Sequence, residues 1–149
     1  MFRSGMAAQP RHFEFIDHTA DVIVRAYGPT RNDAFAAAAE ALFDVITDSA
    51  AIEGRDEIAF TVESIDLEGL LVAYLSELIV LHEIENIVLS DFVVDIQGDE
   101  KLEATARSEP FDPERHGDGT PVKGISYHLM KIGVSDDGRT HFVEVLLDI

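Results

Sequence analysis

The chain has 149 residues, of which 46% are hydrophobic and 27% charged, and this composition is typical of one globular domain that buries about two-thirds of its unfolded surface. It has no cysteine, which excludes disulfides, thiolate catalysis and cysteine-ligated zinc. No apolar run approaches the roughly 18 to 20 residues that cross a bilayer, and the N-terminus lacks the apolar core of a signal peptide. We therefore expect a cytoplasmic protein with no membrane partner.

The formal net charge of −18 narrows the choice of partners. Proteins bind phosphate backbones through lysine and arginine, and this chain has 11 of these against 29 acidic residues. Direct nucleic-acid binding is therefore not expected, whereas a basic protein partner or a hard cation is favoured. The alternative is that the charge only keeps the surface hydrated in an acidic or halophilic cytosol.

The first half of the chain alternates between strand and helix patterns. Residues 1–11 read as a disordered lead-in, and a single domain is expected over residues 12–149. Alternating apolar residues predict a strand from Phe13, and a β-branched run predicts a second one at 22–27. Thr30, with Asp33 three residues on, predicts the cap of an alanine-rich helix that ends at Thr47.

The second half contains one more long helix and most of the strands. Asp66 can cap a helix with a buried stripe of leucines, near whose end His82 can satisfy free carbonyls. Prolines and glycines predict a long irregular loop over residues 109–124. Strands are predicted at 58–65, 88–97, 101–108, 125–134 and 141–149.

The predicted order is therefore β-β-α-β-α-β-β-β-β. Two helices among seven strands joined mostly by short turns indicate an α+β domain of two layers, in which both helices pack on a mostly antiparallel or mixed sheet.

The first candidate site is the polar segment between the first two strands. Asp17, His18, Thr19 and Asp21 fall where the first strand should end, and the next strand starts at once. Regular structure on both sides would hold these side chains at the rim of a sheet. Acidic residues at strand ends are also ordinary turn formers, so the segment alone does not decide between the two readings.

The second candidate is the end of the chain. Asp148 is followed by the terminal carboxylate of Ile149, and the alternating apolar residues before them predict a strand buried to its final residue. Two fixed carboxylates are costly to bury unless a cation neutralises them, and Asp21 would supply a third oxygen ligand. Oxygen-only ligation suits Ca²⁺, Mg²⁺ or Mn²⁺. The alternative is that these acids are unrelated surface residues.

The third candidate is the segment from Lys123 to His128, where the long loop enters a strand. Lys123 could pair with Asp21 or Asp148, or reach a partner. His128 could be a ligand, an acid–base group or a core histidine. The sequence contains no serine triad spacing, phosphate-binding glycine loop or paired zinc histidines.

Taken together, these segments resemble the archease family. Gly124 and Ser126 stand where that family more often has alanine and threonine, and residues 1–10 lie outside the resemblance. The motifs that carry it, in the family's order, are Glu14 with Asp17-His18-Thr19-Ala20-Asp21, Ala41-Leu42-Phe43, Leu75-Ser76-Glu77-Leu78, Glu109-Pro110-Phe111-Asp112, Val122 to His128, and Leu147-Asp148-Ile149.

The resemblance implies a protein cofactor of the RtcB-type RNA ligase, which joins tRNA exon halves with GTP and a divalent metal, rather than an enzyme. The family's role is to promote ligase guanylylation and multiple turnover. Its metal site maps to Asp21, Asp148 and Ile149, with Ca²⁺ the first candidate and Mg²⁺ or Mn²⁺ as alternatives. The family's required lysine maps to Lys123, and we expect Lys123, His18 and His128 to face the partner.

Two other functions remain open at this point. A general protein-interaction or chaperone-like module would bind unrelated clients without needing a metal. A metal-dependent phosphoester hydrolase using Asp21, Asp148 and His128 would turn over with no ligase present, although the sequence offers no clear nucleophile.

Overall fold

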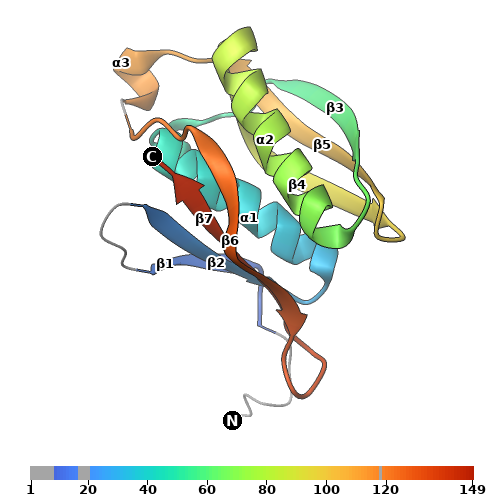
Figure 1. Ribbon diagram of the computed structural model, residues 1–149. Helices are drawn as coiled ribbons and strands as arrows, with labels where there is room; N and C mark the ends of the chain where they lie inside the picture. The colour runs from blue at the N-terminus through green and yellow to red at the C-terminus, as the bar shows by residue number, and fades with distance from the viewer. Residues whose placement is uncertain (1–8, 17–20, 118) are drawn as a thin grey trace.

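The computed structural model describes residues 9–16, 21–117 and 119–149. Two long helices, α1 (Arg31–Ile46) and α2 (Leu67–Glu85), accompany seven strands (Figure 1). Short helical turns lie at η2 (Ser49–Ala51) and α3 (Pro113–His116). The strands are β1 (His12–Ile16), β2 (Val22–Gly28), β3 (Asp56–Glu63), β4 (Ile87–Gln97), β5 (Lys101–Pro110), β6 (Gly124–Val134) and β7 (His141–Asp148).

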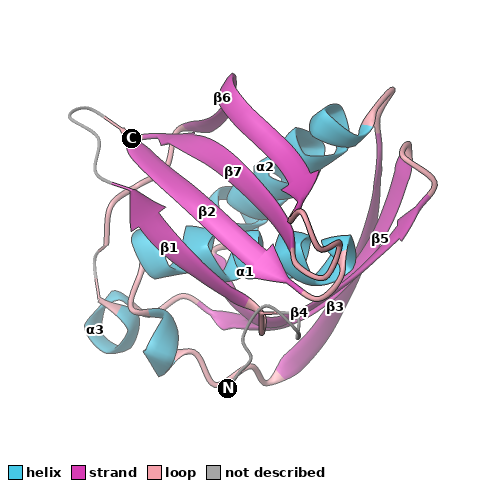
Figure 2. Cartoon of the chain, turned by 90° about the horizontal axis from the view of Figure 1, so that it is seen from below, coloured by secondary structure: helices cyan, strands magenta, loops and turns pink. Residues whose placement is uncertain are grey.

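The strands form two antiparallel sheets. One has the order β1-β2-β7-β6 and the other the order β3-β5-β4. Helix α1 contacts β2 and β7 of the first sheet and β4 of the second, while α2 contacts β6 and all three strands of the second sheet. The helices therefore lie between the sheets, as Figures 1 and 2 show.

The prediction of an α+β fold with two main helices is confirmed, and the strand order along the chain is as expected. The sequence predicted one sheet, whereas the structure has two. The reason lies in α1, whose alanines are buried around its circumference: Ala34, Ala36, Ala37, Ala38, Ala39 and Ala41 are each at most 2% exposed. A helix with small residues on every side can be approached closely by a sheet from two directions.

The N-terminal caps of both long helices form as the sequence predicts. The Thr30 hydroxyl oxygen accepts the Asp33 N–H at 3.1 Å, and the Asp66 carboxylate accepts the Gly69 N–H at 2.7 Å. Each of these caps satisfies a backbone N–H group that the helix start leaves without an intrahelical partner. His82 differs from its expectation, because its Nδ1 lies 2.8 Å from the carbonyl oxygen of Ile87, the first residue of β4, rather than from a carbonyl of the helix, which ends at Glu85 with Asn86 as its C-cap.

The N-terminal lead-in falls partly within the described residues. The Gln9 N–H donates to the Thr140 hydroxyl at 3.0 Å, and Arg11 forms an ion pair with Asp33 at 2.6 Å. These contacts tie residues 9–11 to the domain that starts with β1, while residues 1–8 lie outside the described part. Within that described part, no helix combines the length and apolar character needed to span a membrane.

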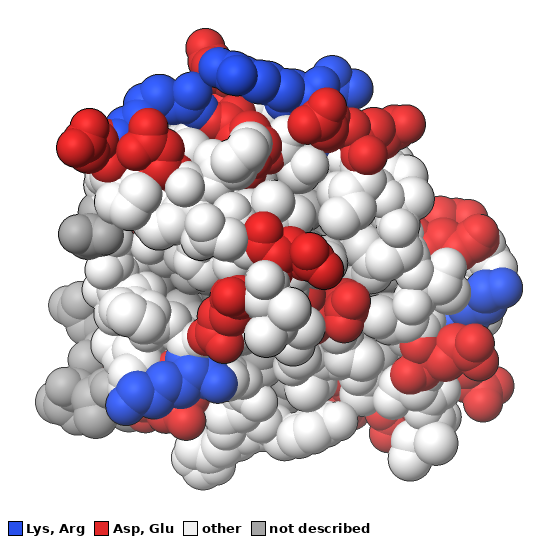
Figure 3. Space-filling model, turned by 90° about the horizontal axis from the view of Figure 1, so that it is seen from above, with Lys and Arg blue, Asp and Glu red and all other residues white. Residues whose placement is uncertain are grey.

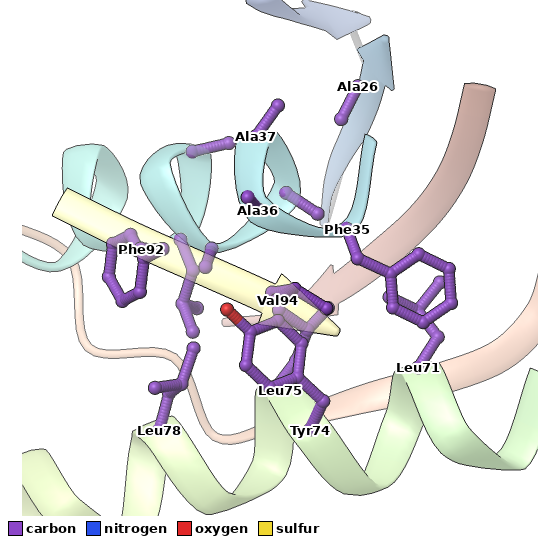
Figure 4. Packing of buried hydrophobic residues seen from close by; sticks show 14 of the residues in the cluster. Ala26, Phe35, Ala36, Ala37, Leu71, Tyr74, Leu75, Leu78, Phe92 and Val94 are labelled. Atoms are coloured by element: carbon purple, nitrogen blue, oxygen red, sulfur yellow. The ribbon is translucent and has the colours of Figure 1, made fainter. Parts of the chain in front are cut away.

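The core between the helices is built from large side chains of α2 and β4 against α1 (Figure 4). Tyr74 is fully buried there, and its hydroxyl has no hydrogen-bond partner among the described residues. Burial raises the pKa of this phenol, because the charged form loses its hydration.

Replacing Tyr74 with Phe should therefore raise the free energy of unfolding by about 1 kcal/mol, since it removes a buried polar group without changing the packed ring. Urea unfolding of the wild type and the variant measures this difference. Tyr27→Phe is the matched control, because the Tyr27 hydroxyl donates to Glu14 at 3.1 Å. A loss of stability in Tyr74→Phe larger than in the control would contradict the assignment of an unsatisfied hydroxyl.

Candidate functional site at the end of the first sheet

The end of β7 lies between the starts of two other strands. Val22 of β2 pairs with Leu147, and Gly124 of β6 pairs with Asp148. Continuing the β2 ladder by one residue brings Asp21 beside Asp148. On the other side, the Lys123 N–H donates to the Asp148 carbonyl at 2.7 Å. Figure 2 shows the C-terminus beside the start of β2. The pairing thus brings the backbones of Asp21, Lys123 and Asp148 together at one end of the sheet, where β7 ends and β2 and β6 begin.

The burial of this end differs from the prediction. The buried run of β7 stops at Leu147, Asp148 is exposed, and Ile149 is half-buried against the core. The expectation of a strand buried to its final residue is therefore wrong at Asp148, which is exposed between the buried Leu147 and the half-buried Ile149. Because Asp148 is exposed, burial gives no reason for a cation to bind its carboxylate. The remaining reason to expect a bound cation is the proximity of the like charges of Asp148 and Asp21 on neighbouring strands.

The available donors suit a hard cation only in part. Asp21 and Asp148 offer carboxylate oxygens, the ligands that Ca²⁺ and Mg²⁺ prefer. Within the described residues, no three His, Asp or Glu side chains gather into a cluster that could hold a metal ion. A cation held here would therefore need further oxygen ligands from water or a partner to complete its coordination.

The predicted partner-facing residues lie in different places. The Lys123 side chain is exposed, directly before β6. His128 is also exposed, within an irregular part of β6 where its N–H donates to the Ser126 hydroxyl at 3.0 Å, so it is not a core histidine. His18 lies outside the described residues, together with Asp17, Thr19 and Ala20.

A buried ionic cluster in the loop before Lys123 was not predicted. Glu109 is 2% exposed, and its Oε1 accepts the N–H groups of Glu53 and Gly54 at 2.6 and 2.7 Å. Its Oε2 lies 2.6 Å from Nε2 of His116, which is completely buried, and forms an ion pair with Arg115. The whole carboxylate is thus satisfied by groups that belong to two separate loops.

The hydrogen bonds of His116 define its protonation. Its Nδ1 accepts the Asp112 N–H at 2.9 Å, so the proton of the neutral ring is on Nε2, which donates to Glu109. Burial lowers the pKa of His116, and the charge of Arg115 lowers it further. Asp112 also caps α3 through the Glu114 N–H, with Pro113 at the first helical position. The Asp-Pro pair is a sequence signal that could have predicted this short helix, although the sequence analysis read the segment as an irregular loop.

The Glu109 cluster and its neighbours hold the backbone of the described part of the loop, residues 109–117 and 119–124, in a defined conformation. The Phe111 N–H donates to the Asn86 carbonyl at 2.9 Å, and the Phe111 ring lies between the rings of His82 and His116. Farther along, the Thr120 N–H donates to the Val45 carbonyl at 2.8 Å. These contacts lead the backbone to Lys123, so the Glu109 cluster helps to set where Lys123 meets β7.

Two hollows flank this part of the loop. One, of about 190 Å³, is mostly apolar and includes His82, Phe111 and Val122 in its lining. The other, of about 360 Å³, is lined by Phe15, Asp21, Asp44, Thr120 and neighbouring apolar residues.

The fold and this end define the class of the protein: a small α+β domain with carboxylates and a lysine collected at one sheet edge. The family model described as Archease protein family (MTH1598/TM1083) matches residues 13–149. The chain therefore belongs to the archease family. Members of this family are known as cofactors of RtcB-type ligases and are generally non-catalytic activators.

Individual relatives agree with this assignment. The chain is 48% identical over 132 residues to the protein archease of Pyrococcus furiosus, covering 87% of this chain and 93% of that one. It is 40% identical over 140 residues to the protein archease of Sulfurisphaera tokodaii, covering 92% and 98%.

Solved structures show the same fold. The solution structure of Methanobacterium thermoautotrophicum protein 1598 matches with a TM-score of 0.79 at 35% identity, over 92% of this chain and 98% of that one. The crystal structure of a Thermotoga maritima archease, described as a possible chaperone, matches with a TM-score of 0.55 at 18% identity, over 90% and 94%. The second likeness concerns the fold alone.

Replacing Glu109 with Ala should lower the free energy of unfolding by about 1–3 kcal/mol, because it leaves the buried His116 ring and two backbone N–H groups without their acceptor and removes the ion pair with the exposed Arg115. Chemical denaturation measures the loss. Glu114→Ala is the control, since Glu114 is an exposed glutamate of the neighbouring turn and should change the value by less than about 0.5 kcal/mol. Equal effects in the two variants would contradict a structural role for the Glu109 cluster.

The His116 ring should also make stability depend on pH. Its pKa is lowered in the folded chain, so the unfolded chain binds this proton more readily and stability falls as the pH drops below the ordinary value of 6.5. The His116→Gln variant has no imidazole to protonate at this position, so it does not show this loss of stability. The stability advantage of the wild type over the variant should therefore shrink between about pH 7.5 and about pH 5.5. A difference that stays constant over this range would rule out a neutral His116.

Proposed function

We propose that this protein is a protein cofactor of an RtcB-type tRNA-splicing RNA ligase, which it assists by promoting ligase guanylylation and multiple turnover. The observation that carries the proposal is the meeting of Asp21, Lys123 and Asp148 at one sheet edge through the pairing of β2, β6 and β7. Membership of the archease family supports the choice of an RtcB-type ligase as the partner.

The acidic end would act on the ligase through a divalent cation. Asp21, Asp148 and the Ile149 carboxylate would hold it, with Ca²⁺ as the first candidate and Mg²⁺ or Mn²⁺ as alternatives. When bound, the cation would supply positive charge that brings carboxylates and phosphate oxygens together. Because Asp148 is exposed, the site is accessible to a partner without rearrangement of the buried strand.

Lys123 would have a separate task. Its backbone is bound to β7, whereas its side chain is exposed, so the ammonium group can balance the neighbouring carboxylates or contact a phosphate oxygen of the ligase's nucleotide. The charge distribution favours a protein partner over RNA itself. On the face in Figure 3, basic side chains lie mainly along one edge, interspersed with acidic ones, rather than forming a continuous basic surface.

The test measures the rate of ligase–GMP formation with the ligase and GTP, with and without this protein, under limiting divalent metal. Asp148→Asn should reduce the stimulated rate at least about tenfold, equivalent to about 1.4 kcal/mol, because it removes one charged donor without changing the shape of the strand end. Asp136→Asn is the control, since Asp136 is also exposed but lies in the turn at the opposite end of the β6–β7 hairpin.

Full stimulation by Asp148→Asn would refute the role of the acidic end. Stimulation that is insensitive to metal chelation, together with equal binding of unrelated proteins, would favour the chaperone-like alternative. Phosphoester hydrolysis by this protein alone, lost in Asp148→Asn, would favour the hydrolase.

A further inference from the structure

Strand β6 leaves its ladder just beyond the functional end. Gly124 to Ser126 pair with β7, and pairing resumes at Lys131, which lies opposite Glu144. Residues 127–130, four residues, therefore stand opposite the single residue Val145, and we call them the β6 bulge. Bulges of this kind redirect side chains out of the regular pleat.

The backbone of the bulge includes a leucine in an unusual conformation. Leu129 has a φ angle of 62°, in the left-handed region. Asn86 and Asp91 are the other non-glycine residues with positive φ in the part of the chain described. Short polar side chains such as theirs adopt this conformation readily, whereas a leucine side chain crowds the backbone. The fold thus holds Leu129 in a conformation that its side chain disfavours.

The same segment exposes large apolar side chains. Tyr127 is 60% exposed and Leu129 is 47% exposed, with the exposed His128 between them, while Met130 packs against the core. Neither Tyr127 nor Leu129 belongs to the buried cluster that stabilises the domain. Strain and exposed apolar surface both oppose folding, and their coincidence in one segment is typical of a binding element.

The position of the β6 bulge indicates which partner would bind it. The bulge begins directly after the part of β6 that pairs with the last residues of β7. It is therefore continuous with the part of the molecule that carries Lys123 and Asp148. Strand β6 is also the last strand of its sheet (Figure 2). A partner that covers both Asp148 at the end of β7 and the neighbouring edge strand β6 would meet Tyr127 and Leu129 as well.

We propose that Tyr127 and Leu129 form an apolar docking knob that inserts into an apolar recess of the RNA ligase. This inference rests on the proposed function and adds the contact that holds the partner in place. An enzyme that binds RNA carries basic groups around its site, so the net charge of −18 favours encounter, while the knob supplies the contact area that slows dissociation. The knob provides affinity, and the acidic end acts on the reaction.

The experiment titrates this protein against a fixed concentration of the tRNA-splicing ligase from the same organism. It measures the concentration that gives half-maximal ligase–GMP formation, together with direct binding by calorimetry. Tyr127→Ser and Leu129→Gly should each raise the half-maximal concentration by about tenfold to hundredfold, because each removes a large apolar contact. The maximal stimulated rate should stay unchanged.

Leu129→Gly separates docking from folding. Glycine adopts the left-handed conformation without strain, so the melting temperature should be retained or raised while binding is lost. Asp91→Gly makes the same backbone change in the irregular part of β4, and Val134→Ser removes an equally exposed apolar side chain, 47%, from the far end of β6. Both controls should leave the half-maximal concentration at the wild-type value.

The outcomes separate the two proposals. If the wild type stimulates the ligase and the bulge variants do so at the same half-maximal concentration, the docking knob is refuted while the proposed function stands. If the wild type neither binds nor stimulates the ligase, both are refuted. If the bulge variants alter self-association of the protein alone, seen by sedimentation, the surface binds a second copy instead, and the inference is overturned.

Discussion

The central place of β7 in its sheet is the constraint on which the functional end depends. This strand is paired on both sides, by β2 and by β6, and both ladders run to its last residues. Because antiparallel register fixes which residues are neighbours, the pairing of β7 with β2 and β6 brings residues 21, 123 and 148 close together in the fold.

The buried carboxylate of Glu109 is the second feature that stabilises the part of the molecule around Lys123 and Asp148. Glu109 joins the turn at Glu53 and Gly54 to the short helix that contains His116, and so orders a loop rich in proline and glycine. An isolated buried charge is costly, but one with four donors is satisfied and holds its surroundings in a single arrangement. The loop that delivers Lys123 is thereby as well defined as the strands on either side of it.

Strands β4 and β6 each contain an irregularity in their pairing with a residue of positive φ, but the two irregularities have different explanations. In β4 the left-handed position is occupied by Asp91, a residue type that tolerates it, whereas in β6 it is occupied by Leu129. The first is explained by local backbone chemistry. The second joins strain with an exposed apolar side chain beside the functional end, which associates it with recognition rather than with stability.

The sequence by itself determined the order and type of the main elements, the Thr30 and Asp66 caps and the α+β class, because these depend on local periodicity and local hydrogen bonds. Through the resemblance to the archease family it also predicted a common site for Asp21, Lys123 and Asp148, whose backbones the pairing of β2, β6 and β7 brings near one another. Tertiary structure alone decided that the strands divide into two sheets, that Asp148 is exposed, and that Glu109 and His116 are buried together. Those properties depend on which distant segments cover a residue, and no local pattern specifies that.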